Sequence, residues 1–200
     1  MLSHPVHFRV VFPEQMNRIH VIIRLVLLAA IGAAGCSSLY WLLFLGLPAL
    51  AALFIVQKGA PRYLEEDAPR VVRVLRWLAG AYAYLWLLTD APPTGEASGQ
   101  VELDVEPTGE PSAASALLRL LYSLPALVVL AVLSLVASLF WVAGALFIVV
   151  TRRVPIPIAD FLAAVLRYQF RLIAYHLSLV DRYPSFEEAD VPHLSGPKAA

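Results

Sequence analysis

The sequence predicts an all-α integral membrane protein built from two tandem repeats. Each repeat would contain a transmembrane helical hairpin and an interfacial amphipathic helix, with short cytoplasmic strands. Three observations predict this fold. Of the 200 residues, 60% are hydrophobic and 15% are charged, whereas soluble domains are about half apolar and about a quarter charged. Residues 25–57 and 120–151 contain no Asp, Glu, Lys or Arg, and several short motifs occur twice.

The repeats are recognised from motifs that recur in the same order. A Leu-Arg-aromatic motif, an Ala-Tyr pair and an aspartate occur first at Leu75-Arg76-Trp77, Ala83-Tyr84 and Asp90. They recur 91 residues later, at Leu166-Arg167-Tyr168, Ala174-Tyr175 and Asp181. We therefore expect one repeat at 1–93, an acidic linker with a strand at 94–114, a second repeat at 115–186 and a polar tail at 187–200.

Each uncharged stretch is longer than thirty residues, whereas one helix crosses the hydrocarbon with about 20 residues. Each stretch therefore predicts two short spans joined by a turn, which we place at 18–35 and 38–57 and at 115–133 and 135–151. Small residues from Gly32 to Ser38 mark the first turn, and Ser134 and Ser138 mark the second. The alternative for the second repeat is a single kinked or tilted span.

The topology is predicted from the basic residues. All 15 Lys and Arg residues lie outside the two uncharged stretches. If each hairpin returns to its starting side, every basic residue lies on one face, which the positive-inside rule assigns to the cytoplasm together with both termini. The alternative makes the third helical segment of each repeat a full span, and the two repeats would then have opposite orientations.

Two segments alternate apolar and polar residues, as half-buried strands do. The polar positions of 4–12 carry His7 and Arg9, and those of 101–105 carry Glu102 and Asp104. Opposite charges on facing strands stabilise the pairing. We therefore expect the two segments to form a small ribbon that ties the repeats together; the alternative is a pair of disordered tethers.

The third segment of the second repeat, at 158–180, has an arginine-bearing side and an aromatic side. Its counterpart at 70–88 carries its arginines early and its aromatic residues later, and it is less amphipathic. Helices of this kind lie in the membrane interface. Gly80 occupies the position that Arg171 occupies in the second copy, and small residues permit close helix packing. We therefore expect the first copy to be more covered by protein and the second to be more exposed to headgroups.

The candidate functional residues fall into two groups. Basic and aromatic residues near helix ends are expected to contact lipid headgroups: Arg24, Arg119, Arg76, Arg167, Arg171, Trp77, Tyr84 and Tyr175. One small residue and four large aromatic residues are expected to pack against partner subunits: Gly80, Tyr40, Trp41, Phe140 and Trp141. For Arg24 and Arg119 the alternatives are an anionic ligand site or an intramembrane ion pair.

The sequence contains no recognisable catalytic constellation, and we expect no enzyme activity, cofactor, metal or nucleic-acid partner. It has no Gly-rich phosphate loop or nucleophile elbow, and its single cysteine, Cys36, excludes a disulfide within the chain. Cys36 also lies in a run that resembles a lipoprotein cleavage box, although the apolar residues continue beyond it. His20 and His176 are expected to make ordinary hydrogen bonds; the alternative is ligation of a haem or metal.

The repeated motif resembles a known family. Residues Leu166–Tyr175 and Leu179–Phe186 are similar to the domain-of-unknown-function 4389 family of bacterial integral membrane proteins, in which the unit is often duplicated. The opening His4-Pro5-Val6 also fits the start of that family, whereas residues 91–94 lack its tyrosine and terminal phenylalanine. The resemblance implies a multi-pass protein of the bacterial inner membrane. It implies no activity, so no catalytic residue is carried over.

These patterns favour a non-catalytic accessory or scaffold subunit that packs against a larger membrane protein complex and anionic lipid. Its expected partners are membrane lipids and other integral membrane subunits. The uncharged spans, which offer no polar pathway, and the large aromatic residues favour this function. The alternative is a small transporter or channel for lipid or a small solute, with Arg24 and Arg119 flanking an entry.

Overall fold

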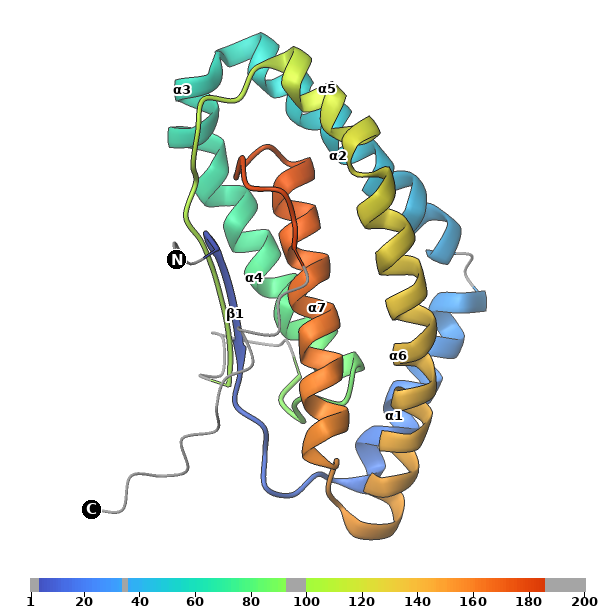
Figure 1. The fold of residues 1–200 in the computed structure, drawn as a ribbon. Helices are drawn as coiled ribbons and strands as arrows, with labels where there is room; N and C mark the ends of the chain where they lie inside the picture. Colours follow the sequence, from blue (N-terminus) through green and yellow to red (C-terminus); the bar gives the residue numbers. More distant parts are fainter. Residues whose placement is uncertain (1–3, 34–35, 93–99, 186–200) are drawn as a thin grey trace, which may run out of the picture.

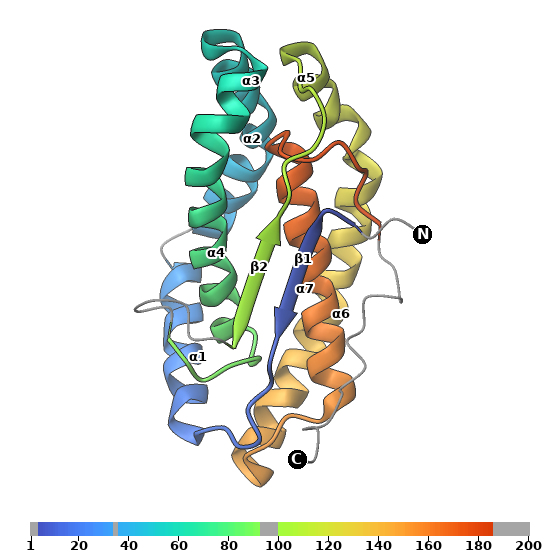
Figure 2. The same cartoon turned by 90° about the vertical axis from the view of Figure 1, so that its left-hand side faces the viewer.

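The computed structural model describes residues 4–33, 36–92 and 100–185, and for residues 36–45 it describes the backbone alone. The elements form three layers (Figures 1 and 2). A ribbon of β1 (Val6–Val10) and β2 (Val101–Val105) covers a central layer of α4 (Ala68–Leu85) and α7 (Ile156–His176). The outer layer consists of four helices: α1 (Arg18–Ala33), α2 (Cys36–Lys58), α5 (Ala113–Tyr122) and α6 (Leu124–Thr151). Two short helices, α3 (Ala60–Arg62) and η1 (Tyr63–Asp67), connect α2 to α4.

The two strands pair as the sequence predicts. They are antiparallel, with His7 opposite Asp104 and Arg9 opposite Glu102. Their apolar residues, Val6, Phe8, Val10, Val101, Leu103 and Val105, are buried against the central helices, and the residues between them are exposed. The apolar residues of this alternation form the covered face of the ribbon, and the residues between them form an exposed, charged face. The prediction of a paired ribbon is confirmed.

The burial of the two central helices is the opposite of what the sequence predicts. Nearly every residue of α7 from Ile158 to His176 is buried, because the ribbon, α4 and the outer helices all pack around it. Phe170 of α7, for example, stacks on Phe8 of β1 with ring centroids 5.6 Å apart. In α4, by contrast, Arg70 and Trp77 are exposed. The expectation that the second copy would be the more exposed one is therefore wrong.

The predicted break in the second uncharged stretch is also wrong. Helix α6 continues for 28 residues through Ser134 and Ser138. The Ser138 hydroxyl donates to the carbonyl of Leu135 at 2.6 Å, so this serine satisfies its own polar group inside the helix and requires no turn. The interruption lies instead at Ser123, between α5 and α6, where Pro125 occupies the first turn of α6. The alternative of a single kinked or tilted span is met in length and composition by α6, and whether this helix crosses a membrane stays a prediction.

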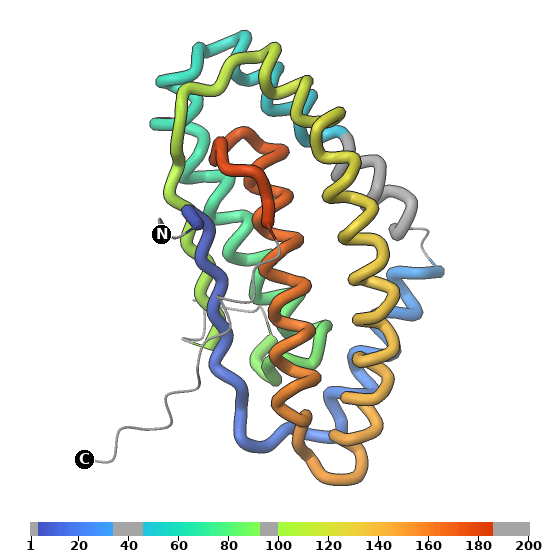
Figure 3. Tube along the Cα trace, in the orientation of Figure 1, coloured from blue at the N-terminus to red at the C-terminus, as the bar shows by residue number. Residues whose placement is uncertain are grey.

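The outer helices form two antiparallel lines rather than two closed hairpins. The breaks that define α1 and α2 fall close to the predicted ends, but α1 lies at one end of the molecule and α2 at the other (Figures 1 and 3). Helix α2 packs beside α5, and α1 packs beside α6. The central helices are antiparallel too, since α4 runs down and α7 runs up in Figure 2.

Among the described helices, Leu124–Thr151 alone is long and apolar enough to cross a membrane, by length and composition. Its most apolar window has a mean hydropathy of 2.6, and 22% of that window is buried. Two shorter apolar helical segments, Gly46–Lys58 and Ala113–Tyr122, lie in the same layer. These three apolar helical segments therefore all belong to the outer layer.

Candidate functional site

A buried arginine binds the C-terminal end of α4. The side chain of Arg24, on α1, has no exposed surface. Its guanidinium donates to the carbonyl of Thr89 at 2.6 Å and to the carboxylate of Asp90 at 2.8 Å. It also lies over the ring of Tyr84, 4.6 Å from the centroid. Thr89 and Asp90 lie just beyond Leu85, the last residue of α4, and a cation near the C-terminus of a helix interacts favourably with the helix dipole.

The same arrangement occurs at the end of α7. Arg119, on α5, donates to the carbonyls of Tyr175 and Val180 at 3.0 and 2.6 Å and forms an ion pair with Asp181. Its guanidinium lies 4.7 Å from the centroid of the Tyr175 ring. The motif Ala-Tyr followed by Asp therefore has one geometric use at both places. The tyrosine supplies a ring for the cation, and the aspartate supplies a carboxylate.

Both central helices end in the same type of cap. The amide of Leu88 donates to the carbonyl of Ala83, and the amide of Leu179 donates to the carbonyl of Ala174. The residue before each donor has a left-handed backbone, with φ of 63° at Leu87 and 54° at Ser178. This hydrogen bond and the left-handed residue define a Schellman cap. The cap turns the chain so that the following carbonyl and aspartate face the arginine.

The segments that precede the outer helices hold the two aspartates. The amide of Asn17, next to α1, donates to the carboxylate of Asp90 at 2.6 Å. Before α5, Thr108 donates its amide to the carbonyl of Leu179 at 2.9 Å. Gly109 follows with φ of 86°, and a Cβ there would lie 1.4 Å from a carboxylate oxygen of Asp181. Glycine is therefore required at position 109 by both backbone and space.

These contacts correct the placement of four candidate headgroup residues. Arg24, Arg119, Tyr84 and Tyr175 are all buried, and both arginines donate to protein carbonyls and carboxylates. The alternative of an ion pair matches the observed contacts. The partner carboxylates were present in the repeated motif, but they lie more than sixty residues along the chain from their arginines.

The arginine of the Leu-Arg-aromatic motif binds the ribbon in both halves of the chain. Arg76 of α4 donates to the carbonyl of Leu103 at 2.9 Å and pairs with Asp104 at 3.1 Å. Arg167 of α7 donates to the carbonyl of Phe8 at 3.4 Å. Phe8 and Leu103 are directly paired in the ribbon. The two arginines thus fasten equivalent points of the two strands to the two central helices.

The other expected contact residues are divided between interior and surface. Arg171 is buried and donates to the carbonyl of Ser185 at 2.9 Å, which corrects its expected exposure to headgroups. Arg76 and Trp77 remain exposed by more than half. For these two residues a headgroup contact stays a prediction.

The residues expected to pack against partners are partly engaged inside the protein. Phe140 contacts Phe161 of α7 with ring centroids 4.8 Å apart. The indole of Trp141 donates to the carbonyl of Leu85 at 2.8 Å. Gly80 is half-buried on α4. The side chains of Tyr40 and Trp41 lie outside the described residues.

The two histidines near helix ends make hydrogen bonds to hydroxyl groups. The ring of His20 lies 3.1 Å from the Tyr84 hydroxyl, and that of His176 lies 2.6 Å from the Ser123 hydroxyl. The expected ordinary hydrogen bonds are therefore confirmed. Within the part of the chain that the structure describes, no group of three or more His, Cys, Asp and Glu side chains is placed to hold a metal.

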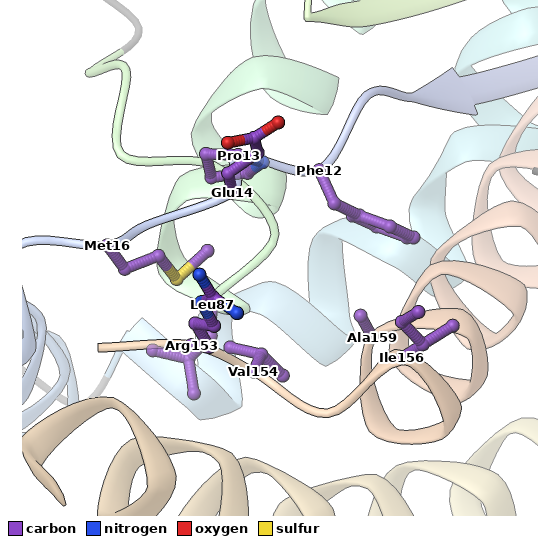
Figure 4. A pocket seen from close by; sticks show the side chains of 9 residues that line it. All are labelled: Phe12, Pro13, Glu14, Met16, Leu87, Arg153, Val154, Ile156 and Ala159. Carbon is purple, nitrogen blue, oxygen red and sulfur yellow. The ribbon is translucent and has the colours of Figure 1, made fainter. Parts of the chain in front are cut away.

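A cavity of about 490 Å³ opens between the segment after β1, the end of α4 and the start of α7 (Figure 4). Apolar side chains form most of its wall, including Phe12, Met16 and Leu87, with Glu14 and Arg153 as the charged members. Neither charged side chain is buried.

The outer layer presents a broad apolar surface. On α6 the residues at spacings of three and four, Val128, Val132, Leu135, Leu139, Val142 and Leu146, are all exposed. The opposite stripe, with Ala126, Leu130, Ala137, Gly144 and Ile148, is buried against the protein. Helix α1 likewise exposes large apolar residues, among them Ile22 and Val26. Exposed apolar surface of this kind is typical of sites that contact lipid or another protein.

Comparison with known proteins found a family match for residues 113–187. Residues 113–187 match the family model described as domain of unknown function DUF4389. The match covers α5, α6 and α7 together with the Arg119–Asp181 pair, and it supports the resemblance found in the repeated motif. No curated protein and no solved structure matches the chain.

Proposed function

We propose that the protein is a non-catalytic accessory or scaffold subunit of the bacterial inner membrane, in contact with lipid and other integral membrane subunits. The apolar outer face is the observation that carries this proposal. Leu135 and Leu139 of α6 are each 68% exposed, and exposure of apolar area to water costs about 25 cal/mol per Å². Lipid acyl chains or apolar partner helices remove that cost.

The use of the buried charged groups supports a structural role. Arg24 and Arg119 hold the ends of the central helices, and Arg76 and Arg167 bind ribbon carbonyls. Buried charged side chains with a structural role form hydrogen bonds and ion pairs with protein groups, and they do not point into a substrate site. In the described residues, the hydrogen bonds of these four arginines go to protein groups, although Nε and Nη1 of Arg24 are buried without a hydrogen-bond partner there.

We also propose that the chain arose by tandem duplication of one unit. The two arginine sites, the two Schellman caps and the two arginine–ribbon contacts are matched one to one. Related units joined by an antiparallel ribbon give a molecule with approximate twofold symmetry. Such symmetry allows the two halves of the outer face to contact a membrane surface equivalently.

The transporter alternative gains no support from the described residues. The apolar stripe of α6 faces outward, and the arginines expected to flank an entry are engaged in ion pairs at helix ends. A transport path requires polar groups that line a passage through the outer layer. We therefore favour the accessory or scaffold function.

Membrane fractionation and native mass spectrometry test this proposal. The wild-type protein should stay with membranes after an alkaline wash and should co-purify with other integral subunits under gentle solubilisation. The double variant Leu135→Lys/Leu139→Lys should be released or lose those subunits. The matched control His7→Ala/Glu102→Ala, on the exposed face of the ribbon, should behave as wild type. Repeated isolation of a lone monomer from gently solubilised membranes would contradict the scaffold function.

A further inference from the structure

We infer that the outer layer lies parallel to the bilayer plane within one leaflet, instead of crossing it. Its apolar face contacts the acyl chains, and the ribbon and α4 remain in water on the side from which the protein binds. This inference rests on the membrane association proposed above and specifies its geometry. The occupant of the outer face is thus a lipid leaflet with anionic headgroups at its surface.

The position of the ribbon argues against a crossing orientation. The strands lie beside the middle of the molecule along its long axis, in parallel with α4 and α7 (Figure 2). Arg9 and Glu102 are exposed on the ribbon, and neither edge of this two-stranded sheet has a neighbouring strand, although Arg76 and Arg167 donate to the carbonyls of Leu103 and Phe8. If the long helices stood upright in the membrane, these exposed residues and edges would lie at the depth of the hydrocarbon. Open sheet edges do not occur in contact with lipid at that depth.

Helix α4 carries further charged residues at the same position along the long axis of the molecule. Arg70, Arg73 and Arg76 are exposed on the central layer, which runs alongside the outer helices in both views (Figures 1 and 2). Charged side chains within a bilayer normally face a protein interior or a water-filled cavity. An orientation with the outer layer parallel to the membrane keeps all three arginines in water.

The distribution of charge on the outer layer fits one leaflet. Its exposed basic residues occur at the two ends, with Arg18, Arg152 and Arg153 at one end and Arg62 just beyond the other. Between these ends the exposed stripe of α6 carries no charged residue. Basic residues at the border of an apolar face contact anionic headgroups. In the parallel orientation both basic ends meet the same headgroup layer.

The length of the outer helices leads to the same orientation. Helix α6 alone has 28 residues, or about 42 Å at ~1.5 Å per residue. The hydrocarbon core is about 30 Å thick, and α5 extends the line further. Upright helices would therefore carry their apolar ends into water, whereas helices parallel to the surface bury the whole stripe.

Site-directed labelling in oriented vesicles tests the inference. In a Cys36→Ser background, single cysteines replace Glu65 in η1, Arg153 after α6, Arg9 in the ribbon and Leu139 on the outer face. The vesicles are right-side-out and inverted membranes, treated with an impermeant maleimide. We expect positions 9, 65 and 153 to react from the same side. Position 139 should resist the maleimide and, once it carries a fluorophore, should be quenched by nitroxide lipids.

The outcomes separate the orientation from the proposed function. Glu65→Cys and Arg153→Cys lie at opposite ends of the outer layer, so labelling from opposite sides would overturn the parallel orientation while leaving membrane association intact. Release of every variant into the soluble fraction, with Leu139→Cys fully reactive, would overturn both. Equal quenching depth at positions 128, 139 and 146 supports the inference, and a graded depth profile along α6 refutes it.

Discussion

Removal of the Arg119 guanidinium should destabilise the protein far more than removal of its partner's charge. In Arg119→Leu, the buried carbonyl of Val180 loses the guanidinium as its donor, whereas the carbonyl of Tyr175 keeps the amide of Ser178 as a donor at 3.0 Å. Each unsatisfied buried carbonyl costs about 1–3 kcal/mol. Leucine restores part of the packing. We therefore expect the free energy of unfolding to fall by about 1–3 kcal/mol, the cost of one buried carbonyl left without a donor.

The partner variant, Asp181→Asn, should have a small effect for a structural reason. The Asp181 side chain is 48% exposed, so solvent screens its interaction with Arg119 and limits the contribution of the pair to about 0–1 kcal/mol. Asparagine still accepts a hydrogen bond from the guanidinium. Denaturant unfolding in detergent, followed by tryptophan fluorescence, measures both changes against wild type.

The first arginine site provides a matched comparison. Arg24→Leu should resemble Arg119→Leu, because Arg24 also donates to a buried carbonyl, that of Thr89, just after the end of α4. Asp90→Asn should cost more than Asp181→Asn, because the Asp90 side chain is only 22% exposed and also accepts the Asn17 amide. If Asp181→Asn destabilised the protein as much as Arg119→Leu, the helix-end carbonyls would not be the main partners. The proposed role of the arginines would then be refuted.

Three further predictions concern backbone strain and pH. Gly109→Ala should lower the free energy of unfolding by more than Gly59→Ala does. Both residues have positive φ, but of the two positions only 109 would bring a Cβ into a clash, with Asp181. Equal losses of free energy in denaturant titrations would contradict this prediction. Ser178→Gly should raise the melting temperature, since glycine relieves a left-handed residue (φ 54°) worth about 1–2 kcal/mol; a lower value would count against strain there. Burial raises the pKa of Asp160, an effect that Arg167 partly opposes, so ionisation costs stability as pH rises from 3.8 through the raised pKa. Asp160→Asn should therefore be more stable than wild type at pH 7, with a difference that shrinks toward pH 4; a constant difference between those pH values in unfolding curves would exclude the linkage.

The sequence contained enough information to predict the ribbon but not the central layer. In a strand the buried and exposed residues alternate with a period of two, so the sequence predicts which face is buried. The opposite charges of Arg9 and Glu102 predicted that the two strands pair with each other. A helix that is covered on all sides has no such signal. The arginines on α7 suggested a wet face, yet their partners are the backbone of the ribbon and of the chain after the helix. Those contacts depend on long-range packing and cannot be read from local periodicity.

The same limit explains the error in the outer layer. An uncharged stretch is compatible with two short spans, one long helix or a surface helix, because composition does not encode the direction in which the chain continues. Serine interrupts an apolar pattern in sequence, but a serine that donates to a carbonyl in its own helix, as Ser138 does, leaves the helix intact. The predicted second hairpin depended on serine as a turn signal, and it fails for that reason.

The repeated motif is explained once its two functions are separated. Its arginine fastens a central helix to a strand, at Leu103 in one half and at the paired Phe8 in the other. Its tyrosine and aspartate receive a second arginine from the outer layer. Each central helix is therefore bound on one side to the ribbon and on the other to the apolar layer. Because the polar fastenings join the layers internally, the outer face can remain apolar over its whole length, as contact with lipid requires.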